Sequence, residues 1–259
     1  MGHIAPSARS GGPGSASHYT TSVFGVEDED LPQITPAHLR RADDMCRRRL
    51  AREVSGGKRR ANRAADMRFA VSNRLEADAR LAQSELGPPR AEAFVEPREL
   101  EPEQRALYRA ATRGYLDAFA ATAARIAEPE WRTALPELGV ELSSSLGLRA
   151  ELDDGGRELR KVLVGARRDA KLLDPIDVRV ALVRTEEWAP VQLEIVAVDV
   201  IEQRRTVYTP DLGAERAEAH EWIAQRVALV LELAADARPQ AGRDCQGCAF
   251  ISGCSKHPG

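Results

Sequence analysis

The sequence lacks an apolar run long enough to cross a membrane, and it lacks the common motifs of nucleotide hydrolysis and acyl transfer. Its longest apolar runs, such as residues 178–183, have the length of a strand, whereas a membrane helix needs roughly 18 apolar residues. It contains no glycine-rich phosphate loop and no G-x-S-x-G pattern. We therefore expect a cytoplasmic protein that has no membrane partner and belongs to neither of these enzyme classes.

Cysteine is also scarce, and its distribution is informative. One cysteine, Cys46, lies near the front, and the other three form a C-x2-C-x5-C triplet of Cys245, Cys248 and Cys254. Four thiolates suit a [4Fe-4S] cluster or a zinc ion. Two disulfides are disfavoured, because residues 1–33 contain no continuous apolar stretch typical of a secretory signal and the chain is too long to need disulfides for stability.

A zinc site is the main alternative to the cluster. His257 follows Cys254 by three positions and could supply a local fourth ligand, which would leave Cys46 as an ordinary buried thiol. The spacing favours the cluster, held by all four cysteines.

The charge of the chain is unevenly distributed. Of 259 residues 43% are hydrophobic and 30% charged, and the net charge is only -3. However, residues 40–74 contain twelve Lys or Arg and four Asp or Glu. Such a block attracts a polyanion, so DNA is the expected partner, and a solvated helical face is the alternative. The candidate nucleic-acid contacts are Arg47, Arg48, Arg49, Lys58, Arg59 and Arg60.

The order of elements predicts one domain after an N-terminal tail. Residues 1–33 are rich in Gly, Ser, Pro and Ala and are expected to be disordered, and residues 34–259 form the domain. The expected parts are a helical portion over 34–135, a sheet over 140–210, a long helix over 213–236 and a cysteine segment over 244–257. Three helices are predicted in the helical portion: one capped by Thr35 that runs to about Val54, one over roughly 58–86 and one over about 103–127.

The sheet is predicted to begin with a hairpin. Residues 146–152 and 161–165 alternate around the turn signal Asp153-Asp154-Gly155-Gly156. Residues 178–185 and 191–200 are the next predicted strands. We expect four or five strands, largely antiparallel.

This order of parts resembles the iron-sulfur branch of the PD-(D/E)XK nucleases, which includes RecB-like and AddB-like nuclease domains and the exonucleases of CRISPR adaptation. The resemblance is carried by Thr35-Pro36-Ala37-His38-Leu39 ahead of Cys46, and by the terminal triplet with Phe250 inside its five-residue gap. It implies a restriction-endonuclease-like α/β fold, with a central mixed sheet flanked by helices. It also implies an Fe-S clasp that joins the two ends, a role in DNA repair or recombination, and a helicase or other repair protein as partner.

The resemblance also implies a catalytic pattern. These nucleases place a carboxylate at the end of one strand and Asp/Glu-x-Lys on the next, and the carboxylates hold Mg²⁺ or Mn²⁺. Asp169-Ala170-Lys171 matches the Asp-x-Lys pattern, and Asp154 or its neighbour Asp153 is the candidate for the earlier carboxylate.

The rest of the catalytic pattern is missing from the sequence. The predicted strand over 177–184 contains no Asp/Glu-x-Lys, and no histidine occurs between Arg47 and Tyr208, where cluster-bearing relatives usually have one. We therefore expect a DNA-binding nuclease fold with a degenerate centre. The alternatives are an active Mg²⁺- or Mn²⁺-dependent DNA exonuclease and a zinc-stapled domain that binds another protein.

Overall fold

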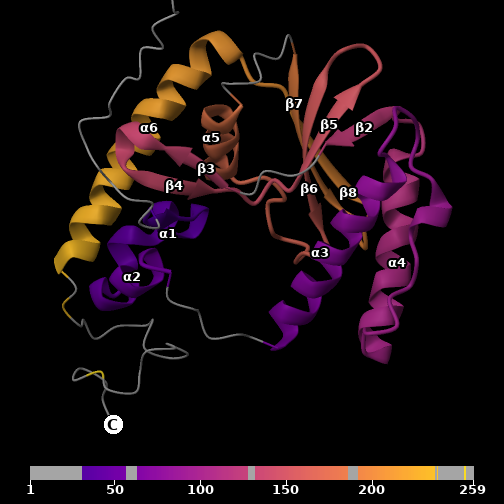
Figure 1. The fold of residues 1–259 in the computed structure, drawn as a ribbon, viewed down its shortest axis with the longest axis horizontal. Coiled ribbons are helices and arrows are strands. Elements are labelled where there is room, and N and C mark those ends of the chain that lie inside the picture. The colour runs from indigo at the N-terminus through magenta and orange to yellow at the C-terminus, as the bar shows by residue number, and fades with distance from the viewer. Residues whose placement is uncertain are drawn as a thin grey trace, which may run out of the picture. The chain divides into compact units, whose positions relative to one another are not determined.

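Two mixed β-sheets and the helices that flank them make up the fold (Figure 1). The structure is a computed structural model that describes residues 31–56, 63–127, 132–185, 192–236, 238 and 254. All of these belong to one compact unit, Leu31–Gly259. None of the helices in these ranges is both long and apolar enough to span a membrane.

The first described segment forms two helices instead of the single predicted one. The expected cap is confirmed: the Thr35 hydroxyl accepts a hydrogen bond from the His38 N–H at 3.2 Å, and Pro36 begins α1 (Pro36–Arg41). A 3₁₀ turn (η1, Ala42–Asp44) follows, and α2 spans Arg47–Val54. The prediction of one continuous helix is wrong because Met45 is extended, with ψ of 142°, which turns the chain before Cys46.

The next two helices pack against each other. Helix α3 spans Arg63–Ala82, and α4 spans Pro102–Phe119, with a short 3₁₀ helix (η2, Ala91–Ala93) between them. The helix predicted over about 103–127 ends earlier than expected, at Phe119, and residues 124–127 form strand β2 instead. Helix α4 approaches the main sheet closely: a Cβ on Gly114 would lie 1.8 Å from the Val200 carbonyl oxygen.

Five strands form the main sheet, and their spatial order follows their order along the chain. All neighbours are antiparallel except β6 and β7, which are parallel. The predicted hairpin is confirmed, with Gly155 at a φ of 83° in its turn. The strands are β2 (Ala124–Ala127), β5 (Leu148–Leu152), β6 (Arg157–Leu163), β7 (Leu193–Asp199) and β8 (Arg204–Tyr208).

The strand predicted over 178–185 is wrong. This segment lies in helix α5 (Pro175–Arg184), which Asp174 caps through a hydrogen bond from the Ile176 N–H at 2.9 Å. The physical reason lies in the sheet, because two parallel neighbours need a long crossover connection, usually a helix. The valines of this segment pack into the core as part of the helix, and this packing outweighs their preference for strands.

A second, three-stranded sheet was not predicted. It contains β1 (Gln33–Ile34), β4 (Val140–Ser143) and β3 (Arg132–Leu135), in that spatial order, and a 3₁₀ turn (η3, Pro136–Leu138) joins β3 to β4. The range 34–135, expected to be helical, therefore also contains β2, β3 and part of β1.

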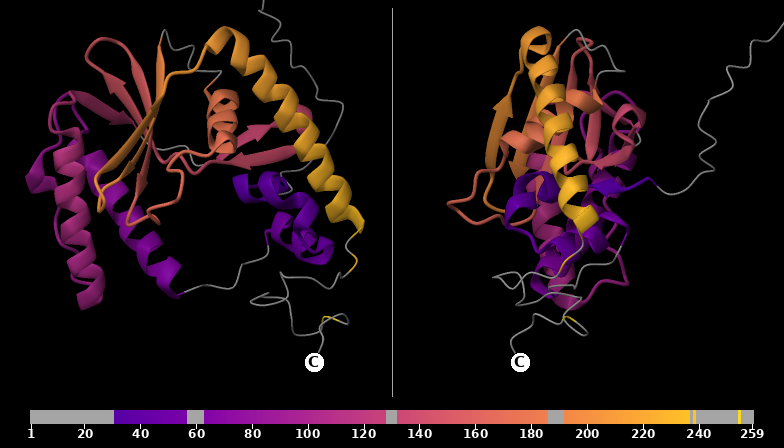
Figure 2. Two further views of the ribbon diagram at one scale, coloured as in Figure 1. Left: turned by 180° about the vertical axis from the view of Figure 1, so that it is seen from behind. Right: turned by 90° about the vertical axis from the view of Figure 1, so that its left-hand side faces the viewer.

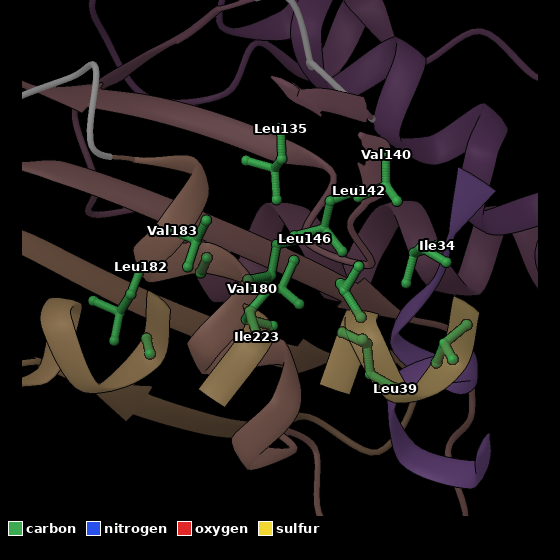
Figure 3. Close-up of a cluster of buried hydrophobic side chains, with 14 of the residues drawn as sticks. Ile34, Leu39, Leu135, Val140, Leu142, Leu146, Val180, Leu182, Val183 and Ile223 are labelled. Atoms are coloured by element: carbon green, nitrogen blue, oxygen red, sulfur yellow. The ribbon is translucent and has the colours of Figure 1, made fainter. Parts of the chain in front are cut away.

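Two apolar cores lie on opposite faces of the main sheet. Helices α3 and α4 cover one face, and α5 and the long helix α6 (Leu212–Asp236, as predicted) cover the other (Figure 1 and Figure 2). Strand β7 contributes side chains to both cores, since Ile195 packs on the α6 side and Val196 on the α3 side. On the α6 side the small sheet joins the core, where Leu142 and Val180 lie together with Ile223 (Figure 3).

Candidate functional site

A cleft lined by both polar and apolar residues opens where the two strands of the hairpin separate. The β5–β6 ladder ends at the pair Leu148 and Arg160, and β6 continues for three more residues, 161–163. These residues, together with 143–145 before β5, one face of α3 and the start of α1, line a cavity of about 1010 Å³. Segments distant in sequence therefore meet at the open end of the hairpin.

A buried carboxylate on α5 organises the floor of the cleft. Asp177 lies in the first turn of α5, and its side chain is 3% exposed. The Lys161 ammonium donates to its Oδ2 at 2.6 Å, and the Ser145 hydroxyl donates to its Oδ1 at 2.8 Å. Both oxygens of Asp177 are therefore engaged by the protein.

A second buried carboxyl group comes from α3. Glu76 is only 6% exposed, and burial raises its pKa to about 8. One turn earlier on the same helix, the Ser72 hydroxyl donates to the Val162 carbonyl of β6 at 3.1 Å. At neutral pH Glu76 is therefore mainly protonated, and it contributes a hydroxyl group instead of a negative charge.

The cleft consequently presents an excess of positive charge and hydrogen-bond donors. Its cationic side chains are Arg40, Arg80 and Lys161; Arg40 also pairs with Asp174 at 2.9 Å. The lining further includes serine hydroxyls and the amide of Asn73. Arg and Lys together with Ser and Asn are the side chains that bind phosphate groups of nucleic acids. The cleft is therefore suited to a phosphorylated polyanion.

The structure does not bring the predicted catalytic residues together. Asp154 lies in the hairpin turn, where its carboxylate accepts from the Gly156 N–H at 2.8 Å. Asp169 and Lys171 are exposed in the loop after the other end of β6, which is held by hydrogen bonds from Arg204 to its carbonyl groups. The seven residues of β6, which span roughly 20 Å, lie between the hairpin turn of Asp154 and the loop of Asp169. None of these three candidates lines the cleft.

The residues of the cleft were missed because their sequence signals are weak. Glu76 and Arg80 are an ordinary i,i+4 pair on a helix, and Asp177 was assigned to a strand. Lys161 gave no clear signal either, because it follows Arg160 in a strand that is charged at four of its seven positions.

Only two of the four cysteines predicted to bind the metal, Cys46 and Cys254, lie within the described residues. Cys46 precedes α2 at its N-cap position and is half-buried, as is Cys254. Cysteine binds iron or zinc through its sulfur as a thiolate. Next to Cys46, Arg47 forms an ion pair with Asp236, the last residue of α6, and only nine positions separate Asp236 from Cys245.

A second contact holds the same two helical segments together. Arg226 of α6 donates to the Leu39 carbonyl at 2.9 Å and pairs with Asp43 at 3.0 Å. The donor set is chemically suitable for a cluster or a zinc ion. Cys245, Cys248 and the alternative ligand His257 lie outside the described residues, and within those residues no group of three or more His, Cys, Asp or Glu could hold a metal.

Two of the six predicted nucleic-acid residues, Arg47 and Arg49, have ion-pair partners within the described part of the chain. Arg47 pairs with Asp236, and the Arg49 guanidinium donates to Glu53 at 2.7 Å. Arg48 is half-buried, and residues 58–60 lie outside the described part of the chain. Arg40 at the cleft is also paired, with Asp174, but its side chain is 42% exposed, against 32% for Arg47 and 19% for Arg49.

No protein-family model matches this sequence, and no curated protein resembles it significantly. The function is therefore inferred from the chemistry of the site itself.

Proposed function

We propose that this chain is a nuclease-fold protein of the iron-sulfur PD-(D/E)XK type that binds DNA in the cleft without cutting it. The observation that carries the proposal is the position of the cleft, at the open end of the β5–β6 hairpin, where the last three residues of β6 line it. The resemblance implies that the catalytic residues of such a nuclease lie at the ends of strands, as these cleft residues do.

The chemistry at that position supports binding more than metal-dependent hydrolysis. At the open end the chain places serines 143–145 on one side and Lys161 on the other. Of the two carboxyl groups in the lining, Asp177 is engaged by Lys161 and Ser145, and Glu76 is mainly protonated at neutral pH. A divalent cation prefers ionised carboxylates that are free to coordinate it.

Strand β6 contains one triplet that resembles the nuclease motif, Glu158-Leu159-Arg160. In the structure the Arg160 guanidinium donates to Glu158 at 2.7 Å, and both side chains are buried on the α4 side of the sheet. This carboxylate is thus neutralised inside the protein, in agreement with a centre that has lost its chemistry.

The metal centre in this proposal is structural. Cys46, Cys245, Cys248 and Cys254 would hold a [4Fe-4S] cluster that, when bound, cross-links helices α1 and α2 to the C-terminal segment. The ion pair of Arg47 with Asp236 supports this, because it holds the segment of Cys46 at the end of α6. Closing a loop of this length is costly in entropy for the unfolded chain, and metal binding to the folded state offsets that cost.

DNA binding can be tested by removing charge from the cleft. In Arg40→Gln/Arg80→Gln we expect at least a tenfold loss of affinity for a labelled oligonucleotide, and a salt dependence that is shallower by about two phosphate contacts. The matched control is Arg167→Gln/Arg168→Gln, which removes two exposed charges from the loop after β6. Equal losses in the two double variants would refute the assignment to the cleft.

Cutting is tested on the same proteins with a DNA-degradation assay in the presence and absence of Mn²⁺. We expect no metal-dependent degradation. Degradation that disappears in Asp169→Ala would instead establish the alternative, an active exonuclease.

A further inference from the structure

Helix α3 has a second face that does not pack into the core. Val71, Leu75 and Ala79 fill the buried face. The other face follows a spacing of three and four residues and lines the cleft along about 16 Å of helix. Its members are Phe69, Ser72, Asn73, Glu76, Ala77 and Arg80.

Phe69 is the unusual member of this polar face, since its side chain is aromatic and 67% exposed. A single exposed apolar residue is ordinary on a protein surface. This one, however, borders the same cleft as Lys161, Arg40 and the serine hydroxyls. An aromatic ring beside cations and hydroxyl groups combines two kinds of contact, one with the flat face of a base and one with its phosphate.

We propose that Phe69 stacks on an unpaired base, so that the cleft binds single-stranded nucleic acid in preference to duplex. This inference rests on the proposed function, and it names the form of nucleic acid and the residue that selects it. In a duplex both faces of an internal base are already stacked, so Phe69 could reach one only if the base left the helix. In a single strand the base faces are accessible while the phosphates remain available to the cations of the cleft.

The test compares Phe69→Ala with Phe69→Trp. Stacking contributes roughly 1–3 kcal/mol per base, so Phe69→Ala should weaken binding of a single strand by about 5- to 150-fold, with an unchanged salt dependence, whereas Phe69→Trp should retain affinity. Binding of the same sequence as duplex should change by less than twofold. The tryptophan of Phe69→Trp should be quenched by the single strand. The matched control is Leu81→Ala, because Leu81 is 60% exposed on the same helix and does not line the cleft.

The outcomes separate this inference from the proposed function. If Arg40→Gln/Arg80→Gln loses affinity while Phe69→Ala binds both DNA forms as the wild type does, or loses both equally, DNA binding in the cleft stands and stacking by Phe69 is refuted. If free mononucleotides bind with a dependence on Phe69 but strands do not bind, the assignment to a strand is refuted. If the wild type binds no DNA, both proposals fail.

Discussion

The Lys161 ammonium lies 2.6 Å from Oδ2 of Asp177 and so links strand β6 to helix α5 at the floor of the cleft. Asp177 is almost fully buried, whereas Lys161 retains 17% of its side-chain exposure on the cleft side. The pair therefore has a structural role within the protein while it leaves a partly exposed cation at the site. This double role makes the pair the first target for mutation.

Removing the lysine should destabilise the fold, because the carboxylate is left buried without its cation. We expect Lys161→Met to lower the free energy of unfolding by about 3 kcal/mol, and Lys161→Met/Asp177→Asn to recover part of the loss. Urea denaturation measures both. As a control, Arg125→Met breaks the exposed ion pair with Glu151 and should cost less than about 1 kcal/mol. Equal costs for the two single variants would contradict the importance of the buried pair.

Glu76 should make stability depend on pH. Burial raises the pKa of Glu76 to about 8 in the folded protein, so between its ordinary value of 4.5 and pH 8 the unfolded chain has lost a proton that the folded state retains. The free energy of unfolding should therefore fall as pH rises through this window, by up to about 4 kcal/mol. Glu76→Gln should be more stable than wild type at pH 8, with a difference that vanishes near pH 4.5. The exposed Glu85→Gln variant should show no such trend.

The same group should make DNA binding depend on pH. Because the pKa of Glu76 is about 8, raising the pH from 7 to 9 places a negative charge in the cleft, and affinity should fall about 3- to 10-fold. Fluorescence anisotropy at constant salt measures this change. In Glu76→Gln the affinity should stay level over this range, whereas Glu85→Gln should follow the wild type. A pH dependence that survives in Glu76→Gln would assign the effect to another group.

Cys46 should be required for a bound metal centre. Anaerobically prepared wild-type protein should be brown and contain iron and acid-labile sulfide, and Cys46→Ser should lose both, because one of four thiolates is missing. His257→Ala serves as the control: it should leave the cluster intact. Colourless protein with one zinc ion that His257→Ala releases and Cys46→Ser retains would instead support the zinc alternative.

Gly114 should tolerate no side chain. A Cβ at this position would lie 1.8 Å from the Val200 carbonyl oxygen, which belongs to backbone and cannot move aside without displacing the end of β7. Gly114→Ala should therefore lower the melting temperature by several degrees, at a cost of about 3 kcal/mol. Gly87→Ala is the control, since no atom lies within 4 Å of its ideal Cβ. A melting temperature for Gly114→Ala equal to that of Gly87→Ala would mean that α4 can shift away from the sheet.

Features that depend on near neighbours in the chain could be predicted from sequence. The cap at Thr35, the hairpin turn around Gly155 and the long amphipathic helix α6 each follow from local hydrogen bonding, backbone freedom or apolar spacing. The order of the parts likewise indicates a mixed α/β fold, whereas the metal centre that the cysteine spacing predicts stays a prediction.

Features that depend on distant contacts required the tertiary structure. Residues 178–184 have strand propensity, but they are helical because β6 and β7 lie parallel and need a crossover between them. The cleft combines Arg40, Glu76, Lys161 and Asp177 from four separate elements, and no pattern within any one element predicts that they meet. The sequence by itself determined the Thr35 cap, the hairpin turn and helix α6, since these depend on local interactions. Only the tertiary structure decided where charge and hydroxyl groups gather, because that follows from the packing of the sheet against its helices.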